Sequence, residues 1–353
     1  MTVVKVTLWR DDATLAHPIE AAGERHVARP RLYLEVEHDD LRGYGEVAAQ
    51  PHALNGDPSA GEVVDALSVR LLPLLVEVTH REGALPEWER IARWRGAHTA
   101  SRFAVALIEM AVLDLALQRA ARSLVDEWPA RFATPELATV SALDSAQWFV
   151  RPGASRIRVK TRPGALSDDV VARLESLATP VLLDFNASAQ GSNDVFEQLE
   201  RLSGVVPVAG VEQPFGPGNL VEHAALASRT AVPVSLDEGV RTTSDLDHVA
   251  RYGAASMVCV KPARVGGLAM TLAMVARATE LGLAVYLGGF FESDLARTVH
   301  RCLAQHAVSE PSDIATVPRA DLTEPEVVET AVGLGVTPSL GALSHARPVV
   351  TLR

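Results

Sequence analysis

The feature that most constrains the fold is a series of eight short apolar runs that begins near residue 137. The runs are rich in β-branched residues, and amphipathic stretches about fifteen residues long separate most of them. Strands that alternate with helices form parallel β–α–β units, and eight such strands predict a closed α/β barrel. The runs are Ala138–Ala142, Ile157–Thr161, Val181–Asp184, Val208–Glu212, Val232–Asp237, Met257–Lys261, Leu283–Leu287 and Ile314–Val317.

Most of these runs end in a charged residue, and five of the charges follow one another at regular intervals. The intervals are 24, 28, 25 and 24 residues, which is about the length of one strand–helix unit. Such residues occupy the carboxyl-terminal rim of a parallel barrel, where active sites are built, so we expect them to meet in one pocket. A rim salt bridge is an alternative for each charge by itself. The five residues are Lys160, Asp184, Glu212, Asp237 and Lys261.

The three acidic residues of this group indicate a metal site. Asp184, Glu212 and Asp237 would repel one another if no cation lay between them, and the pKa of at least one would rise. Mg²⁺ prefers oxygen ligands and keeps some waters or substrate oxygens, so we expect Mg²⁺, with Mn²⁺ as an alternative. The histidines and cysteines show no zinc-binding spacing.

The two lysines of the group indicate proton transfer. Lys160 and Lys261 flank the acidic residues in chain order, which in a barrel places them on opposite sides of the metal. We expect the metal and Arg158 to lower their pKa values, so that each lysine can move a proton. A metal that binds a carboxylate and a lysine that removes the adjacent α-proton constitute enolate chemistry on a small carboxylate substrate.

Composition excludes other classes of function. The chain has 33 basic and 44 acidic residues, a net charge of −11, which argues against nucleic acid and anionic membranes as partners. No apolar run approaches the roughly 20 residues that span a bilayer, and the start MTVVKVTLWRDD does not resemble a signal peptide. Cys259 and Cys302 cannot form a disulfide framework, so we expect a cytoplasmic protein. By analogy with other barrels, a homo-oligomer is possible.

The flanking sequence predicts a smaller α+β unit. We expect a capping domain over residues 1–130, a barrel over 131–321, and a segment 322–353 that packs back on the cap. Alternating patterns predict strands at Val3–Leu8 and Arg31–Val36, and RGYGEV predicts a glycine turn into a third strand. Helical periodicity covers Glu62–Val78 and Ser101–Arg122. For two acids inside the second helix, Glu109 and Asp114, we expect a helix-surface or interhelix salt-bridge role, with a functional role as the alternative.

Five segments carry a resemblance to a known family. The chain resembles the enolase superfamily, and more closely its muconate-lactonizing-enzyme subgroup, over nearly its whole length. The resemblance implies a modified TIM barrel, (β/α)₇β, with an α+β amino-terminal capping domain completed by the carboxyl-terminal segment. It implies Asp184, Glu212 and Asp237 as metal ligands and Lys160 and Lys261 as acid/base residues. The segments are RVK (158–160), LLDFN (182–186), VEQPF (211–215), SLDEG (235–239) and VKPARVGG (260–267).

Within the subgroup, LGGFFESDLAR (Leu287–Arg297) resembles a segment of o-succinylbenzoate synthases and N-succinylamino acid racemases. In the synthase, the resemblance implies that Lys160 takes the α-proton before hydroxide leaves, while the charge of Lys261 stabilises the enolate. In the racemase, the two lysines act on opposite faces of one carbon. A racemase of another N-acylamino acid and a cycloisomerase are further alternatives. A metal- and carboxylate-binding protein without catalysis is the alternative of a different class.

Substrate contacts are expected from the barrel rim and from two loops. Arg158 stands where the family has the first lysine of K-x-K, and its guanidinium cannot shuttle protons. The loops HPIEAAGERHVARPR (17–31) and AAQPHALNGDP (48–58) differ from the family pattern, and such lids usually select the substrate. Strand alternation is expected to point Glu238 away from the metal. The substrate-binding or supporting candidates are Arg158, Asn186, Ser141, Gly288, Gly289 and Glu292.

Overall fold

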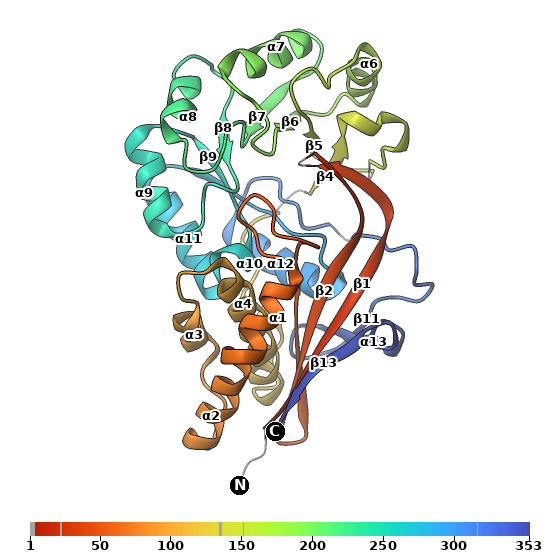
Figure 1. Cartoon of the computed structure of the whole chain (residues 1–353), viewed down its shortest axis with the longest axis vertical. Helices are drawn as coiled ribbons and strands as arrows, with labels where there is room; N and C mark the ends of the chain where they lie inside the picture. The colour runs from red at the N-terminus through yellow and green to blue at the C-terminus, as the bar shows by residue number, and fades with distance from the viewer. Residues whose placement is uncertain (1–3, 22, 134–135, 151, 316) are drawn as a thin grey trace.

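The computed structural model describes residues 4–21, 23–133, 136–150, 152–315 and 317–353 (Figure 1). A parallel sheet with helices outside it forms one end of the molecule, and an antiparallel sheet with its own helices forms the other. Within the described residues, no helix has both the length and the apolar character needed to cross a membrane.

The parallel sheet confirms seven of the eight predicted barrel strands. Its strands lie in the order β10-β9-β8-β7-β6-β5-β4, and every neighbouring pair is parallel, as consecutive β–α–β units require. The strands are β4 (Leu137–Ser141), β5 (Arg156–Lys160), β6 (Val181–Asp184), β7 (Val208–Glu212), β8 (Val234–Leu236), β9 (Met257–Val260) and β10 (Ala284–Leu287).

The eighth run, Ile314–Val317, does not form a strand in the part of it that the structure describes; residue 316 lies outside that part. The preceding residues join the two edges of the sheet instead. The N–H of Leu137 in β4 donates to the carbonyl of Ser312 at 3.1 Å, and the N–H of Asp313 donates to the carbonyl of Leu287 in β10 at 2.8 Å. The run is apolar because residues such as Ile314 are buried. A buried segment need not form a β-strand, so an apolar run alone does not identify one.

Helices and one 3₁₀ segment connect the barrel strands. The first connection is the 3₁₀ segment, and an α-helix follows each later strand. These elements are η3 (Ala142–Gln147), α6 (Asp168–Leu177), α7 (Ser192–Leu202), α8 (Leu220–Ala227), α9 (Thr243–Tyr252), α10 (Pro262–Val265), α11 (Leu268–Glu280) and α12 (Asp294–Ala307).

The antiparallel sheet has the order β13-β1-β2-β3, so the carboxyl-terminal strand completes the cap as expected. Val6 of β1 pairs with Leu352 of β13. The boundaries near residues 130 and 321 between cap and barrel stay a prediction. The cap elements are β1 (Val4–Ala21), β2 (Glu24–His38), β3 (Leu41–Ala48), α1 (Ala60–Ala66), the π-helical η1 (Leu67–Leu71), α2 (Leu72–Glu82), α3 (Trp88–Ile91), η2 (Ala92–Trp94), α4 (Thr99–Arg119), α5 (Leu124–Glu127), β11 (Val327–Glu329), β12 (Val336–Pro338), α13 (Leu340–His345) and β13 (Arg347–Leu352).

The glycines of RGYGEV lie inside β3 and do not form the predicted turn. Asp39 and Asp40, both with positive φ, make the turn between β2 and β3. The glycines allow α4 to approach the sheet. A Cβ at Gly43 would lie 2.3 Å from the carbonyl oxygen of Ala111, and one at Gly45 would meet the next turn of α4 just as closely.

The two acids inside α4 accept backbone hydrogen bonds, and neither forms the expected salt bridge with any residue that the structure describes. Glu109 accepts the N–H groups of Leu268 and Ala269 and so caps the start of α11 in the barrel. Asp114 accepts the N–H of Tyr44 at 2.9 Å. The prediction was wrong because helix periodicity does not reveal that free N–H groups of other elements reach these positions.

Candidate active site

Strand alternation places the predicted charges on the inner face of the barrel. Lys160, Asp184 and Glu212 are the last residues of β5, β6 and β7, while Asp237 and Lys261 directly follow β8 and β9. All five are buried. In a strand, every second side chain lies on the same face, so the residue two positions before each charge also points into the barrel. These side chains fill the barrel below the charged residues. A cluster of Leu137, Leu182, Met257, Cys259 and Tyr286 forms much of this filling.

Each lysine is paired with an aspartate from a neighbouring strand. Lys160 donates to Asp184, and the Nζ of Lys261 lies 2.9 Å from Oδ2 of Asp237. Burial lowers the pKa of Lys261, but the acidic neighbours, Asp237 foremost, together outweigh burial and the net shift is upward. The expected lowering of this pKa is therefore not found, because the aspartate acts directly on the ammonium group.

Glu212 lacks the partners that a buried carboxylate normally has. Neither of its side-chain oxygens accepts a hydrogen bond within the described residues. The nearest cation is Arg158, whose Nη1 lies 3.5 Å from Oε1. Burial raises the pKa of Glu212, and repulsion from Asp184 and Asp237 raises it further. A bound cation would satisfy this carboxylate.

The acidic cluster that could hold a metal differs from the predicted trio in one member. Ligand atoms of Glu212, Asp237 and Cys259 lie within 4.8 Å of one another. Asp184 stands beside this group, with one oxygen held by Lys160 and the other accepting the N–H of Asn186 at 2.9 Å. The thiol of Cys259 was not expected here; it comes from the inner face of β9, two residues before Lys261.

A buried arginine of α10 joins this cluster to the cap. Arg264 donates to Asp237 and makes two further hydrogen bonds, of 2.8 and 2.7 Å, to the carboxylate of Asp57. The sequence analysis placed Arg264 in a family motif but gave it no role.

Lys160 and Lys261 line a cavity between the barrel rim and the cap, whereas Asp184, Glu212 and Asp237 are not among its lining residues. The loop 48–58 contributes several of its walls, as expected for a lid. Glu238 also lines it and accepts a hydrogen bond from Asn186 at 3.2 Å, because β8 ends at Leu236 and alternation does not extend to Glu238. The lining residues are Arg29, Gln50, Leu54, Asn55, Asp57, Arg158, Lys160, Asn186, Glu238, Lys261, Arg264, Gly289, Phe290 and Phe291.

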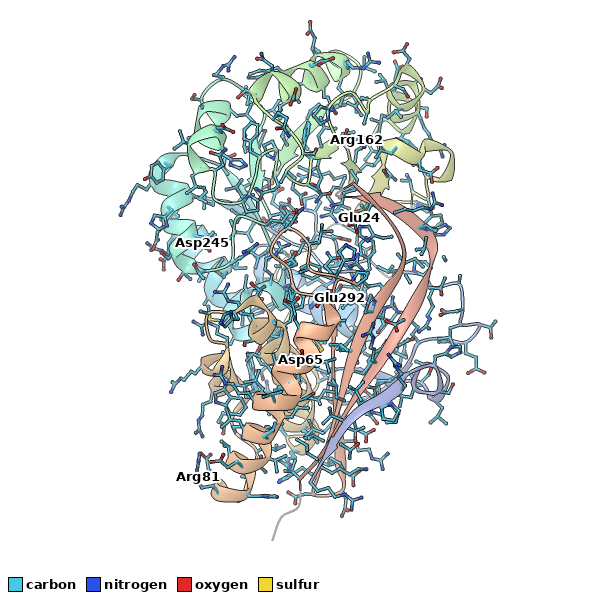
Figure 2. All side chains as sticks on the ribbon, in the orientation of Figure 1. Glu24, Asp65, Arg81, Arg162, Asp245 and Glu292 are labelled. Atoms are coloured by element: carbon cyan, nitrogen blue, oxygen red, sulfur yellow. The ribbon has the colours of Figure 1, made fainter. Side chains whose placement is uncertain are left out.

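The two glycines after β10 leave room for neighbouring side chains. A Cβ at Gly288 would lie 2.6 Å from the Sγ of Cys259 and 3.0 Å from the Cε of Lys261. A Cβ at Gly289 would lie 2.5 Å from Oε2 of Glu292. Glu292 does not line the cavity; it lies near the junction of barrel and cap (Figure 2) and pairs with Arg297 at 3.1 Å.

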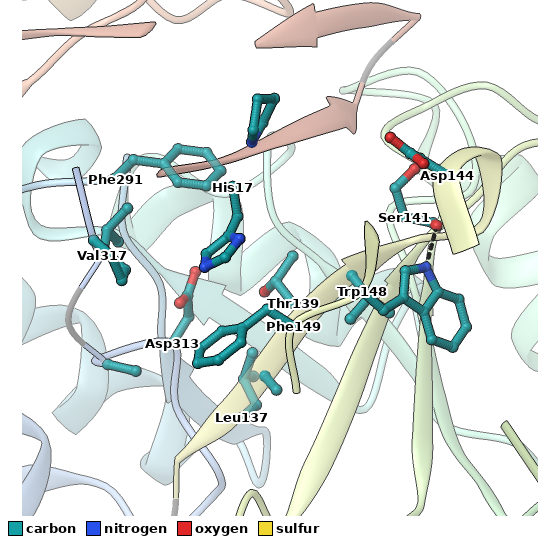
Figure 3. Close-up of a pocket in the computed structure, with 15 residues that line it drawn as sticks. His17, Leu137, Thr139, Ser141, Asp144, Trp148, Phe149, Phe291, Asp313 and Val317 are labelled. Atoms are coloured by element: carbon teal, nitrogen blue, oxygen red, sulfur yellow. Dashed lines mark hydrogen bonds between the residues drawn. The ribbon is translucent and has the colours of Figure 1, made fainter. Parts of the chain in front are cut away.

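A second cavity lies beside the first, and Figure 3 shows its lining residues. Ser141, one of the substrate candidates, belongs to it, and its hydroxyl accepts the N–H of Leu143 at 3.3 Å. His17 of the cap stacks on Phe149, with ring centroids 4.7 Å apart. Phe291 lines both cavities, so the two spaces adjoin at this ring. The second cavity includes Asp313, which pairs with Arg158.

Lysine is rare in this chain and concentrated at the site. The sequence contains three lysines, Lys5, Lys160 and Lys261, against 30 arginines. Lysine differs from arginine in that its pKa can shift enough for proton transfer. The rarity of lysine in the sequence therefore points to Lys160 and Lys261 as candidate catalytic residues. Only the fold shows that Arg29, Asp57 and Glu238 lie beside them.

Comparison with known proteins identifies the family of the chain. The family described as "Enolase C-terminal domain-like" matches residues 142–339. The chain is 28% identical to an N-succinylamino acid racemase of an Amycolatopsis species, over 96% of this chain and 95% of the relative. It is 31% identical to an o-succinylbenzoate synthase of Enterococcus faecalis, with 87% of each chain covered. The muconate lactonizing enzyme of Pseudomonas fluorescens shares the fold, with a TM-score of 0.80, 19% identity and coverage of 98% of this chain and all of that one. The chain therefore belongs to the enolase superfamily.

Proposed function

We propose that this chain is a cytoplasmic, Mg²⁺-dependent enzyme that removes the proton α to a carboxylate through an enolate, in a dehydration like that of o-succinylbenzoate synthase. The observation that carries the proposal is the burial of two of the three lysines beside carboxylates at the barrel rim. Sites of this superfamily are known to combine a lysine or histidine base with Mg²⁺. The substrate is a small carboxylate, in line with the names of the relatives.

We assign Asp184, Glu212 and Asp237 as the metal ligands. The unpartnered oxygens of Glu212 support this assignment, since hard oxygen donors suit Mg²⁺ and also Mn²⁺. Bound there, Mg²⁺ supplies positive charge that polarises the substrate carboxylate and stabilises the enolate. Cys259 is left out because a thiolate is a soft ligand that suits Zn²⁺ or Cu⁺, whereas Mg²⁺ takes oxygen ligands.

The lysines have separate roles in the dehydration. The neutral amine of Lys160 takes the α-proton, so the C–H bond breaks as an N–H bond forms. The ammonium of Lys261 stays charged and stabilises the negative charge of the enolate. When the C–O bond breaks, the ammonium of Lys160 can return its proton to the leaving hydroxide, which departs as water.

A racemase is the second candidate, because a relative with that name covers 96% of this chain. In that reaction, Lys160 and Lys261 exchange roles: one removes the proton of an N-succinylamino or other N-acylamino acid, and the other returns a proton to the opposite face. Cycloisomerisation uses the same enolate with a different second step.

Solvent exchange of the α-proton tests the proposal. The Mg²⁺-loaded enzyme in heavy water is expected to exchange the α-protons of its substrate, and Lys160→Ala should abolish exchange. Lys5→Ala is the matched control, since Lys5 lies in β1 of the cap and pairs with Glu37. In a synthase, Lys261→Ala should slow exchange; in a racemase, each lysine variant should lose exchange for one enantiomer. Full exchange in Lys160→Ala would overturn the assignment of Lys160 as the base. No exchange even by the unmodified enzyme would favour the alternative of a binding protein without catalysis.

A further inference from the structure

Arg158 lies between two carboxylates and donates a hydrogen bond to one of them. Its Nη2 donates to Asp313, whereas its Nη1 lies 3.5 Å from Oε1 of Glu212 without forming a hydrogen bond. Within the described residues, this Nη1 and both side-chain oxygens of Glu212 are buried and have no hydrogen-bond partner. Two buried groups of opposite charge therefore face each other without bonding.

The other two nitrogens of the guanidinium explain why Nη1 does not reach Glu212. Nε donates to Oγ1 of Thr139 on β4 at 3.2 Å, and Nη2 donates to Asp313; both partners are labelled in Figure 3. A guanidinium is planar and rigid, so two bonds of this kind fix the direction of its third nitrogen. Arg158 can turn fully toward Glu212 only if at least one of these bonds breaks.

Asp313 is itself held firmly. Its N–H donates to the carbonyl of Leu287 at 2.8 Å, in the segment that joins the two edges of the barrel sheet. Arg297 of α12 donates to the backbone carbonyl of Asp313 and lies 3.4 Å from its Oδ1. Glu292 in turn pairs with Arg297 at 3.1 Å. The carboxylate that holds Arg158 is thus fixed by the closure of the barrel.

This arrangement matters for a metal at Glu212. A guanidinium can bind both oxygens of a carboxylate at once, and a divalent cation needs the same oxygens as ligands. A close pair between Arg158 and Glu212 would have to break before a metal could bind. An arginine whose charge is not balanced would also repel a cation at the acidic cluster.

We propose that Asp313 is a positioning residue for the metal site: it holds Arg158 away from Glu212 and so leaves that carboxylate available to Mg²⁺. The inference rests on the proposed function, which assigns Glu212 as a metal ligand. Asp313 is not one of the assigned ligands, and its effect passes through Arg158.

Mg²⁺ binding to the protein without substrate tests this role, with titration calorimetry as the measurement. Asp313→Asn keeps the shape of the side chain and frees Arg158 to pair with Glu212, so we expect Mg²⁺ to bind roughly 10- to 100-fold more weakly. Arg158→Met should not weaken Mg²⁺ binding. Combined with Asp313→Asn, it should restore the affinity to within about threefold of the unmodified protein. Such rescue would not occur if Asp313 only stabilised the fold.

A matched control exists on the same pair of elements. Glu310 lies three residues before Asp313 and pairs at 3.0 Å with Arg156, which lies two residues before Arg158 in β5. Glu310→Gln should leave Mg²⁺ binding unchanged. Thr139→Val removes the other bond that holds Arg158 and should weaken Mg²⁺ binding in the same direction as Asp313→Asn, but less. This variant tests the proposal even if Asp313→Asn does not fold.

The outcomes separate this inference from the proposed function. Unchanged Mg²⁺ binding in both Asp313→Asn and Thr139→Val, or a loss in Asp313→Asn that Arg158→Met does not restore, would overturn the role of Asp313 and leave the metal site intact. No Mg²⁺ binding by the unmodified protein would refute the metal site, and the inference with it. Mg²⁺ binding that depends on Asp313, together with no α-proton exchange by the unmodified enzyme, would support the inference and refute the proposed reaction.

Discussion

Arg264 and Asp57 form a bidentate, buried ion pair between the barrel and the loop that follows β3, with N–O distances of 2.8 and 2.7 Å. The same guanidinium also donates to Asp237 at the metal cluster. One side chain thus fixes the position of the lid loop and of a proposed metal ligand together.

Replacing Asp57 by alanine should therefore affect both stability and activity. Of the two carboxylates that Arg264 contacts in the described part of the chain, the change leaves Asp237, and breaking a buried pair costs about 3–5 kcal/mol. Urea unfolding would measure the loss. Asp12→Ala, which breaks the exposed pair with Arg10, should cost about 1 kcal/mol or less. A similar small loss for both variants would show that the Arg264–Asp57 pair does not join cap and barrel.

Glu212→Gln should remove most of the metal affinity. The substitution keeps the shape of the side chain but removes the charge whose oxygens lack protein partners. We expect Mg²⁺ and Mn²⁺ to bind at least about 100-fold more weakly, as titration calorimetry would measure. Chelation of the metal should abolish activity in the unmodified enzyme. Glu82→Gln, an exposed change, is the control; unchanged Mg²⁺ binding in Glu212→Gln would exclude Glu212 as a ligand.

Gly288→Ala should reduce catalysis through Lys261. The added methyl would lie 2.6 Å from Cys259 and 3.0 Å from the Cε of the lysine, so the lysine must move. A displacement of this kind should lower kcat at least about 10-fold, with a smaller change in KM. Gly191→Ala adds a methyl with no atom within 4 Å and serves as the control. Equal activity of both variants would mean that the position of Lys261 tolerates the shift.

Glu109 should make stability depend on pH. Burial raises its pKa from 4.5 to about 8, while the N–H groups of Ala269 and Leu268 act against this rise. Between these pH values the folded state keeps a proton that the unfolded state has lost. The contribution of Glu109 to the free energy of unfolding is therefore fully present below about pH 4.5 and is lost as the pH rises to about 8. The slope is at most about 1.4 kcal/mol per pH unit.

The Glu109→Gln variant checks this sign. The free energy of unfolding, measured from pH 4.5 to 8, should fall less steeply in the variant than in the unmodified protein. An equally steep or steeper fall in the variant would show that the carboxylate is ionised in the folded state throughout this range. Glu82→Gln is again the surface control, since Glu82 is exposed and has no raised pKa.

Seven barrel strands could be predicted because each is a short apolar run followed by a helical pattern. The regular interval between Lys160, Asp184, Glu212, Asp237 and Lys261 also predicts their common rim, since one strand–helix unit brings the chain back to the same end of the sheet. The eighth run misled the analysis because burial alone makes a segment apolar, as at Ile314.

Contacts between distant segments could not be predicted in the same way. Salt bridges were expected for Glu109 and Asp114 because the sequence around them does not reveal which backbone N–H groups donate to them. These N–H groups belong to α11 and β3. Glu238 is turned into the cavity because its strand ends at Leu236, a boundary that the apolar pattern does not mark.

The sequence by itself determined the barrel, the rim position of the carboxylates and lysines, and the membership in a superfamily that those motifs indicate. The periodicity of apolar residues and the spacing of charged residues can be read along the chain, without knowing which segments contact one another in the fold. Only the tertiary structure decided which charges neutralise one another. Among the residues that the structure describes, Arg264 pairs with Asp57 and Asp237, the side-chain oxygens of Glu212 lack hydrogen-bond partners, and Arg29 forms no ion pair. The sequence does not reveal these pairings because they depend on distances between segments that lie far apart in the chain.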